Sequence, residues 1–287
     1  MIRGNEGACP LDLRGKEMIG NIHLRQSVKG LWLKTLLLGA ALFIFEMLFI
    51  LLGTSAQIKE SMLKKMDDIP PMVEKMFGKG FVEVMLKYGI VAIGYIHPFM
   101  LLAFIIFIFM TIFQVVTSEI NSGAIGFTLS KPLSRKRIYF NMAIIIYLGL
   151  GFLALFTFLS SFLGIKIFLG QAFSTGPFAS LAWNLYLVML LAAGYIVIFA
   201  SISDTGKMFF TLGGIVLFVF YILSFASPLW KPLSIFDPIN PFSYYKPMEI
   251  LIGSRIGFGK SLTLIGISGV MFAAAAWVFN RRDISSG

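Results

Sequence analysis

Long apolar stretches alternate with polar segments along this chain. Six of the stretches approach or exceed the roughly twenty apolar residues that a helix needs to cross a bilayer core. They are predicted at about residues 31–52, 89–116, 142–164, 181–202, 208–226 and 262–279. The pattern therefore predicts an all-α membrane protein with six transmembrane helices, in which residues 31–287 form one membrane domain and residues 1–30 precede it.

The N-terminal residues 1–34 are polar and basic. From Leu24 onward, apolar and basic positions interleave at helical spacing, which is typical of an amphipathic helix lying on the inner membrane surface. A solvated leader is the alternative interpretation. No apolar core follows a short basic start, so we do not expect a cleaved signal peptide.

The longest polar connection, residues 53–88, alternates charged residues with apolar ones. Met62 and Met66 lie four residues apart, as do Met72 and Met76, so each pair shares a helix face. Two adjacent prolines should divide the segment into two short helices. Apolar faces resting on the membrane interface explain the methionines best, and a thioether site for Cu(I) is the alternative.

A second connection, residues 227–259, holds five of the eleven prolines. Helix cannot run through that spacing, so we expect an irregular segment anchored by aromatic side chains. Its end, GSRIGFGKS at residues 253–261, resembles a phosphate-binding loop only superficially, because Ser254 stands where that motif needs its first glycine. We therefore expect no nucleotide site in this chain.

Two polar residues within the predicted spans are candidates for function. Glu46 lies inside the first span, where an ionised carboxylate costs about 2.5–3.5 kcal/mol, so it should face protein or water. It could line a translocation path or form a buried contact between helices. His97 precedes Pro98 in the second span, where the proline should kink the helix. This histidine could lie on the same path, although a satisfied contact between helices is the simpler interpretation.

Composition and charge agree with the membrane class. The chain of 287 residues is 57% hydrophobic and 13% charged, whereas soluble domains are about 25% charged. A net charge of +10 is better explained by basic segments that flank a membrane and face anionic lipid than by nucleic-acid binding. The single cysteine excludes an intrachain disulfide, and the two histidines lack metal-site spacing.

The topology that these segments favour places both termini in the cytoplasm. Thirteen lysines and arginines then lie on the inner side and eleven on the outer side. The inner charges include clusters directly beside span ends, at 135–137 and 281–282, as the positive-inside rule expects. The outer 53–88 segment instead mixes its lysines with acids.

The connection between the second and third spans is longer than a simple turn requires, and its polar, glycine and proline residues follow a distinct order. Residues 117–140 contain an acid, two glycines, a proline-containing turn and then a basic cluster. This order resembles the cytoplasmic loop of permease subunits in ABC-2 type ABC transporters, which has an acid, a small residue and an LLS-x-P-x-S/T-R block. The matching residues are Glu119, Gly123, Leu129, Ser130, Lys131, Pro132, Ser134 and Arg135. Thr128 stands where the family has its first leucine.

The resemblance implies a function and its partners. In that family the loop carries a coupling helix that docks on a separate cytoplasmic ATPase, so ATP and Mg²⁺ would bind to the partner and this chain would need no cofactor. Full transporters of the class have twelve spans, which implies a homodimer or a pair with a sister chain in the cell membrane. The resemblance thus predicts the permease subunit of an exporter, with residues 117–138 as its coupling segment.

Other functions remain open at this stage. A secondary transporter or channel would need no ATPase, but it predicts charges in several spans and internal repeats. A non-transporting sensor or assembly subunit would also fit a six-span pattern. We expect no enzymatic activity in the chain itself, because neither histidine is placed beside a nucleophile by the sequence and no paired carboxylates fall within a span.

Overall fold

The computed structural model describes residues 10–66, 70–77, 81–117, 135–169, 174–203, 205–254 and 256–281. These residues are mainly helical, and no strand occurs among them. In order, the elements are α1 (Pro10–Leu52), α2 (Ala56–Met66), α3 (Pro71–Phe77), α4 (Phe81–Tyr88), η1 (Gly89–Ala92), α5 (Ile93–Ile96), α6 (Pro98–Ile112), η2 (Phe113–Thr117), α9 (Arg135–Gly164), η3 (Ile165–Leu169), α10 (Gly176–Ile202), α11 (Gly206–Ala226), η5 (Lys231–Phe236), η6 (Pro241–Tyr244), α12 (Pro247–Leu251) and α13 (Phe258–Arg281).

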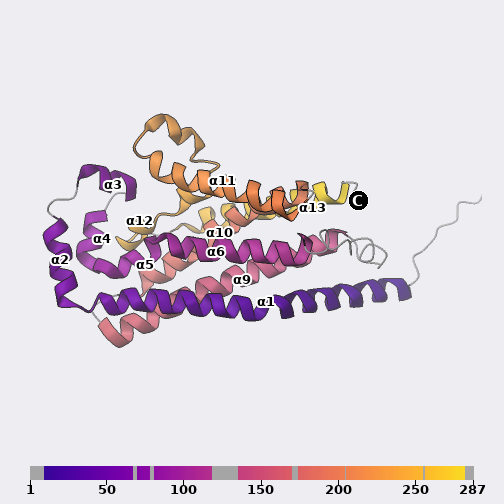
Figure 1. The fold of residues 1–287 in the computed structure, drawn as a ribbon, viewed down its shortest axis with the longest axis horizontal. Helices are drawn as coiled ribbons and strands as arrows, with labels where there is room; N and C mark the ends of the chain where they lie inside the picture. The colour runs from indigo at the N-terminus through magenta and orange to yellow at the C-terminus, as the bar shows by residue number, and fades with distance from the viewer. Residues whose placement is uncertain are drawn as a thin grey trace, which may run out of the picture.

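Six helical stretches are long and apolar enough to cross a membrane, which confirms the predicted number of spans. They are Ser27–Leu52, Phe81–Val115, Arg137–Leu169, Gly176–Ile202, Gly206–Ala226 and Phe258–Arg281. Successive spans run in opposite directions along the bundle (Figure 1). The start of α1, the end of α6, the start of α9 and the end of α13 lie at one end, and α2, α3, α4 and α12 lie at the other. The chain is a multi-pass membrane protein.

The helix α1 is longer than the span that the sequence predicts. It continues from Leu52 back to Pro10, so most of the N-terminal segment extends the first span. Figure 1 shows this part reaching beyond the other helices of the bundle. That residues 10–30 lie on a membrane surface stays a prediction.

The second span is broken rather than simply kinked. Its α5 ends at Ile96, His97 has extended backbone geometry with ψ 134°, and α6 begins at Pro98. A proline disfavours helical geometry in the residue before it and has no N–H to continue the helix, which explains the break. The His97 side chain then caps α6, because its Nδ1 accepts a hydrogen bond of 3.2 Å from the Phe99 N–H.

The first proline-containing connection differs in part from the prediction. The 53–88 segment divides at its prolines, with Pro71 as the first residue of α3, but it holds three short helices rather than two. The third, α4, already belongs to the second apolar stretch, which begins at Phe81. The 227–257 segment contains the short helices η5, η6 and α12, joined by turns. Asn240 holds this segment to the bundle: its Nδ2 donates to the Phe220 carbonyl at 2.9 Å, and its Oδ1 accepts from the Phe242 N–H at 3.0 Å.

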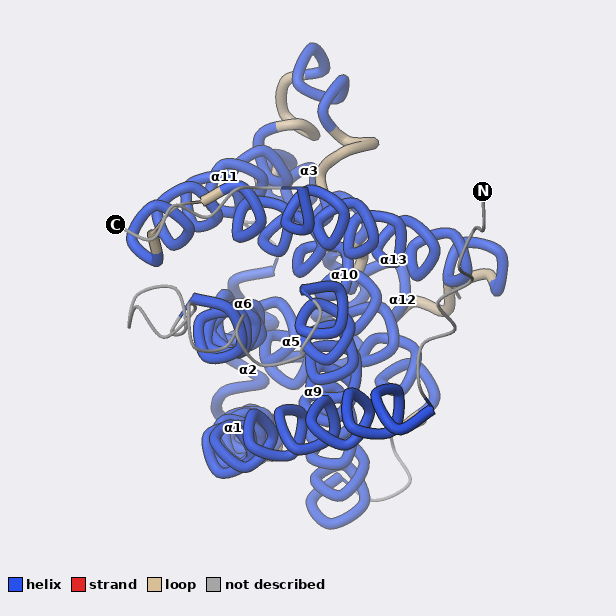
Figure 2. Tube along the Cα trace, turned by 90° about the vertical axis from the view of Figure 1, so that its right-hand side faces the viewer, coloured by secondary structure: helices blue, strands red, loops and turns tan. Residues whose placement is uncertain are grey.

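The helix α10 forms the centre of the bundle. It is buried over most of its length and is apolar nearly all round, as expected of a helix surrounded by protein. In a view along the bundle axis, α10 lies between α13 and α9, and it also contacts α6 and α11 (Figure 2). Gly194 permits close approach of α13, since an added Cβ would meet the Met271 sulfur at 2.9 Å. The helix α10 thus contacts four of the other five membrane-spanning stretches and holds their relative positions.

Gly149 offers a test of this packing. A Cβ added there would overlap the buried ring of Phe107 in α6. We expect Gly149→Ala to lower the free energy of unfolding by about 1–3 kcal/mol, because overpacking a filled core forces side chains to shift. Gly151→Ala is the matched control in the same helix, because its nearest neighbour, Tyr186 Cε2, lies at an ordinary 3.7 Å. Thermal unfolding in detergent measures both, and equal melting temperatures would contradict the α6–α9 packing.

Candidate functional site

Glu46 is fully buried where α1 meets α5 and α9. The hydroxyl of Ser161 in α9 donates to Glu46 Oε1 at 3.3 Å and lies 3.0 Å from the hydroxyl of Tyr95 in α5. The hydroxyl of Tyr245, which follows η6, donates to the Tyr95 carbonyl at 2.8 Å. These four residues form a polar chain that crosses the bundle from α1 to the 227–257 segment, and we call it the Glu46 chain.

The second carboxyl oxygen of Glu46 has no hydrogen-bond partner within the described part of the chain. It packs against Gly94, where an added Cβ would overlap it. No lysine or arginine among the described residues forms an ion pair with this carboxyl. An isolated buried charge is costly, so the neutral acid is the form that suits this environment. The arrangement can hold a proton, and releasing that proton would require a new partner or water at Oε2.

Local sequence explains how α1 and α9 bring these groups together. Ser160 and Ser161 are small polar residues on α9, and the Ser160 hydroxyl donates to the Phe43 carbonyl of α1 at 2.6 Å. That contact ties the two helices at the level of Glu46. Ser161 can also donate to the Thr157 carbonyl at 3.2 Å, so its single proton has two alternative acceptors. The hydroxyl can therefore change direction without moving the helices.

Tyr245 ends the Glu46 chain outside the spans. Burial of its hydroxyl end against Tyr95 raises the pKa of Tyr245 above its ordinary value. The phenol therefore stays protonated and remains a hydrogen-bond donor. Its ring is only partly covered, because it also lines an open cleft at this end of the bundle.

His97 lies next to this region but is not hydrogen-bonded to the Glu46 chain. Its ring is exposed and contacts the aromatic rings of Phe45 and Phe49 on α1, at centroid distances of 5.3 and 6.0 Å. Glu46 on α1 and His97 at the α5–α6 break, the two candidates for a translocation path, thus lie in neighbouring parts of the bundle. The hydrogen bond of His97, however, is to Phe99 of α6 and not to the Glu46 chain.

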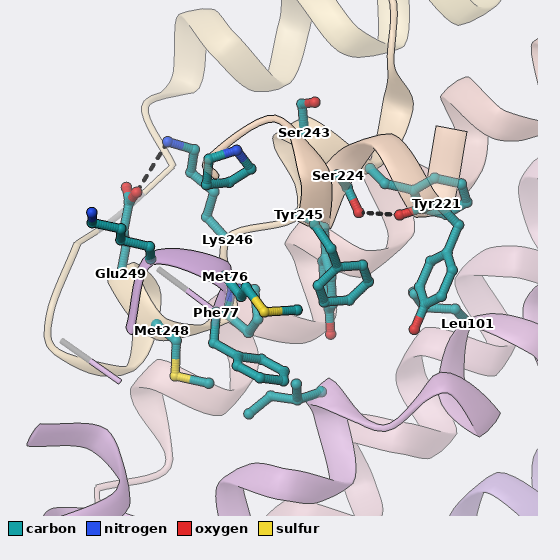
Figure 3. A pocket seen from close by; sticks show the side chains of 16 residues that line it. Met76, Phe77, Leu101, Tyr221, Ser224, Ser243, Tyr245, Lys246, Met248 and Glu249 are labelled. Carbon is teal, nitrogen blue, oxygen red and sulfur yellow. Dashed lines mark hydrogen bonds and ion pairs between the residues drawn. The ribbon is translucent and has the colours of Figure 1, made fainter. Parts of the chain in front are cut away.

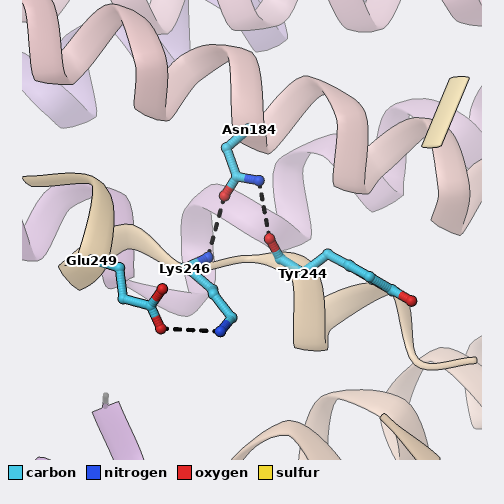
Figure 4. Close-up of polar contacts among 4 residues, drawn as sticks. All are labelled: Asn184, Tyr244, Lys246 and Glu249. Atoms are coloured by element: carbon cyan, nitrogen blue, oxygen red, sulfur yellow. Dashed lines mark hydrogen bonds and ion pairs between the residues drawn. The ribbon is translucent and has the colours of Figure 1, made fainter. Parts of the chain in front are cut away.

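Asn184 was not anticipated from the sequence, although a single asparagine in a long apolar span is a signal that could have pointed to it. It is buried on α10 and binds the backbone of the 227–257 segment on both sides (Figure 4). Its Nδ2 donates to the Tyr244 carbonyl at 3.0 Å, and its Oδ1 accepts from the Lys246 N–H at 3.2 Å. This clamp fixes the backbone on either side of Tyr245.

Replacing Asn184 should loosen that backbone. We expect Asn184→Ala to cost about 1–3 kcal/mol, since it leaves polar backbone groups without partners. Amide hydrogen exchange at Lys246 should accelerate, while exchange in α10 away from the clamp should not. Ser234→Ala is the control, because the Ser234 hydroxyl is exposed and bonds only to the Lys231 carbonyl of its own turn. Unchanged exchange at Lys246 would show that the clamp does not hold this segment.

Most residues of the predicted coupling segment lie outside the described residues. These are Glu119, Gly123, Leu129, Ser130, Lys131, Pro132 and Ser134. Arg135 is the first residue of α9. The element that precedes the segment is described: η2 is a π-helical turn at the end of α6. Gly30 of α1 packs directly against the side chain of Gln114 in η2.

Comparison with models of protein families, with curated proteins and with solved structures finds no match for this chain. Within the ranges that the structure describes, no cluster of three histidine, cysteine or acidic side chains could hold a metal ion. Function therefore has to be inferred from the span pattern, the 117–138 segment and the buried polar groups.

Proposed function

We propose that this chain is the permease subunit of an exporter of the ABC-2 type of ABC transporters, and that its energy comes from a separate ATPase. The observation that carries the proposal is the residue order of the segment between the second and third spans. An acid at 119, a small residue at 123 and an LS-x-P-x-S-R block at 129–135 occur in a chain that otherwise consists of six spans.

The surroundings of this segment support a coupling role. In the sequence it connects η2 to α9, and both the end of α6 and the start of α9 lie at the end of the bundle where α1 starts and α13 ends (Figure 1). Because Gly30 of α1 contacts Gln114 in η2, a force on the segment would reach the first, second and third spans together. A π-helical turn such as η2 is often found at functional positions in helices.

The mechanism assigns a role to each part of the segment. Glu119 would favour the start of a docking helix, Gly123 would permit close approach to the ATPase, and Leu129 would pack on it. Arg135 and the basic residues after it would contact lipid phosphates or acids of the partner. Closure of two ATPases on ATP would move two such segments and shift a pair of permeases between two states, provided that ATP favours one state.

A pull-down in mild detergent from native membranes tests the proposal. The tagged chain should retain a soluble protein that carries a true phosphate-binding loop, and changes within 128–135 should release it. A second six-span chain, identical or related, should remain bound in either case. Recovery of the intact chain without any ATPase, while other membrane complexes stay assembled, would overturn the proposal.

The Glu46 chain favours a second candidate function, secondary transport driven by a proton gradient. A fully buried carboxyl with one unpartnered oxygen is a group that can bind and release a proton during transport. Reconstitution in liposomes separates the two candidates. Transport that requires ATP and the partner supports the permease, whereas transport by this chain alone under a pH gradient supports the second candidate.

A further inference from the structure

An open cleft of about 600 Å³ lies at the end of the bundle opposite the start of α1 and the end of α13 (Figure 3). Its walls come from α3, from the C-terminal end of α11, from the start of α6 and from residues 242–249. The volume falls within the roughly 300–1,000 Å³ of sites that bind small molecules. The cleft is built from segments far apart in sequence.

The inner part of the cleft is apolar. Its lining includes Met76 and Phe77 of α3, Leu101 of α6, Phe225 of α11 and Met248 of α12. The rings of Phe77 and Phe225 meet edge to face at 5.9 Å and join α3 to α11. Thioether and aromatic side chains of this kind adapt to a flexible hydrocarbon chain.

The charged lining residues favour an anion. Lys75 of α3 is exposed and forms no ion pair with the described residues, and Lys246 pairs with Glu249 at 3.0 Å. Among the described lining residues, two lysines and one carboxylate give a net positive charge. Figure 3 shows Lys246 and Glu249 together to one side of Met76, Phe77 and Met248. The cleft thus combines an apolar interior with a basic side.

The position of the cleft indicates where the ligand comes from. It lies where α11 ends at Ala226 and is also lined by residues 242–249 of the segment that follows, so it occupies the level at which the fifth span passes into a connecting segment. Molecules whose charged group remains at the bilayer surface while the tail is buried reach this level from the lipid phase. A soluble anion would leave the apolar interior unfilled.

We propose that this cleft binds a single-chain anionic amphiphile of the surrounding bilayer, with its carboxylate at Lys75 and Lys246 and its acyl chain along Met76, Phe77 and Met248. The binding site does not depend on an ATPase partner, so its test is separate from the test of the proposed permease function. Tyr245 lines the cleft and donates to Tyr95, so an occupied cleft touches the end of the Glu46 chain.

Photolabelling of the purified full chain tests this site. The probe is a sixteen-carbon fatty acid with a photoreactive group near the end of its tail, added to the chain in phosphatidylcholine nanodiscs. Labelled peptides should contain residues from α3, the end of α11 or 242–249. Unlabelled palmitate should compete, and hexadecanol, acetate and octanoate should each compete at least about tenfold more weakly, because each lacks the charge or much of the apolar chain.

Charge variants give effects of opposite sign. Lys75→Gln and Lys246→Gln should each weaken palmitate competition by about three- to tenfold, because each removes an ionic hydrogen-bond donor. Glu249→Gln should strengthen it, since it removes the competing carboxylate, and a misfolded protein could not show that gain. Lys231→Gln is the matched control: Lys231 is an exposed lysine at the same end of the bundle but does not line the cleft.

Several results would overturn the proposal. If hexadecanol competes as well as palmitate, the cleft does not recognise the carboxylate. If acetate competes as well as palmitate, the cleft does not recognise the acyl chain. Labelling confined to lipid-facing surfaces of the spans would place the probe in the bilayer rather than in the cleft. Identical competition in Glu249→Gln and Lys75→Gln would show that these charges do not contact the ligand.

Discussion

Glu119→Lys is expected to abolish ATP-driven turnover and to release the ATPase from this chain. The change reverses the charge at the predicted start of the docking helix, where an acid is favoured by the helix dipole and a lysine is not. Disrupting a charged contact buried at an interface typically costs about 2–5 kcal/mol, so association should weaken by at least about tenfold. Copurification and ATPase stimulation in nanodiscs measure the two effects.

Glu60→Lys is the matched control for this experiment. Glu60 is an exposed acid in α2, at the end of the bundle opposite the start of α9, and its pairing with Lys64 at 2.7 Å is a surface ion pair of small energetic value. The control should keep the ATPase and its stimulation. If Glu119→Lys also keeps both, the 117–138 segment does not couple to an ATPase, and a secondary transporter or a sensor subunit becomes the better description.

Glu46→Lys is expected to prevent stable assembly of the bundle. An ammonium group would be buried beside Tyr95 and Ser161 with no acid paired to it in the described structure, and its longer chain would press on Gly94. A buried lysine at mid-span costs about 2.5–3.5 kcal/mol on insertion scales, and the lost packing adds to that cost. The yield of monodisperse protein and the melting temperature in detergent should both fall.

Glu46→Gln separates the effect of charge from the effect of shape. The amide keeps the size of the side chain and can still accept from Ser161, so this variant should fold and melt close to the original protein. If Glu46 takes up a proton during transport, the same variant should lose the dependence of transport on pH. Equal stability of Glu46→Lys and Glu46→Gln would show that this carboxyl is not enclosed by protein.

The number of helices long and apolar enough to cross a membrane is the part of the fold that the sequence predicted correctly. Hydropathy is a local property that sums over about twenty residues, so it needs no knowledge of which helices pack together. The proline-induced interruptions at 70–71 and at Pro98 were also local, because a proline acts on its own turn and on the residue before it. That the second span starts as early as Phe81, and breaks completely at His97, required the structure.

The candidate site was predictable only in part. A carboxyl within an apolar span signals that Glu46 must face protein or water, but its neighbours Tyr95 and Ser161 are separated from it by 49 and 115 residues in the chain. The same holds for Asn184, whose backbone partners lie 60 and 62 residues further along. The roles that the resemblance assigns to 119–135 stay predictions.

The sequence by itself determined that this protein has six stretches long and apolar enough to cross a membrane, because the burial of apolar side chains in lipid depends on each stretch alone. Only the tertiary structure decided which polar groups meet inside the bundle and that a basic, partly apolar cleft opens between α3, α11 and α12. Such pairings depend on helix rotation and on close approach at small residues such as Gly94 and Gly149. Those are properties of the packed bundle, and no single stretch of the chain encodes them.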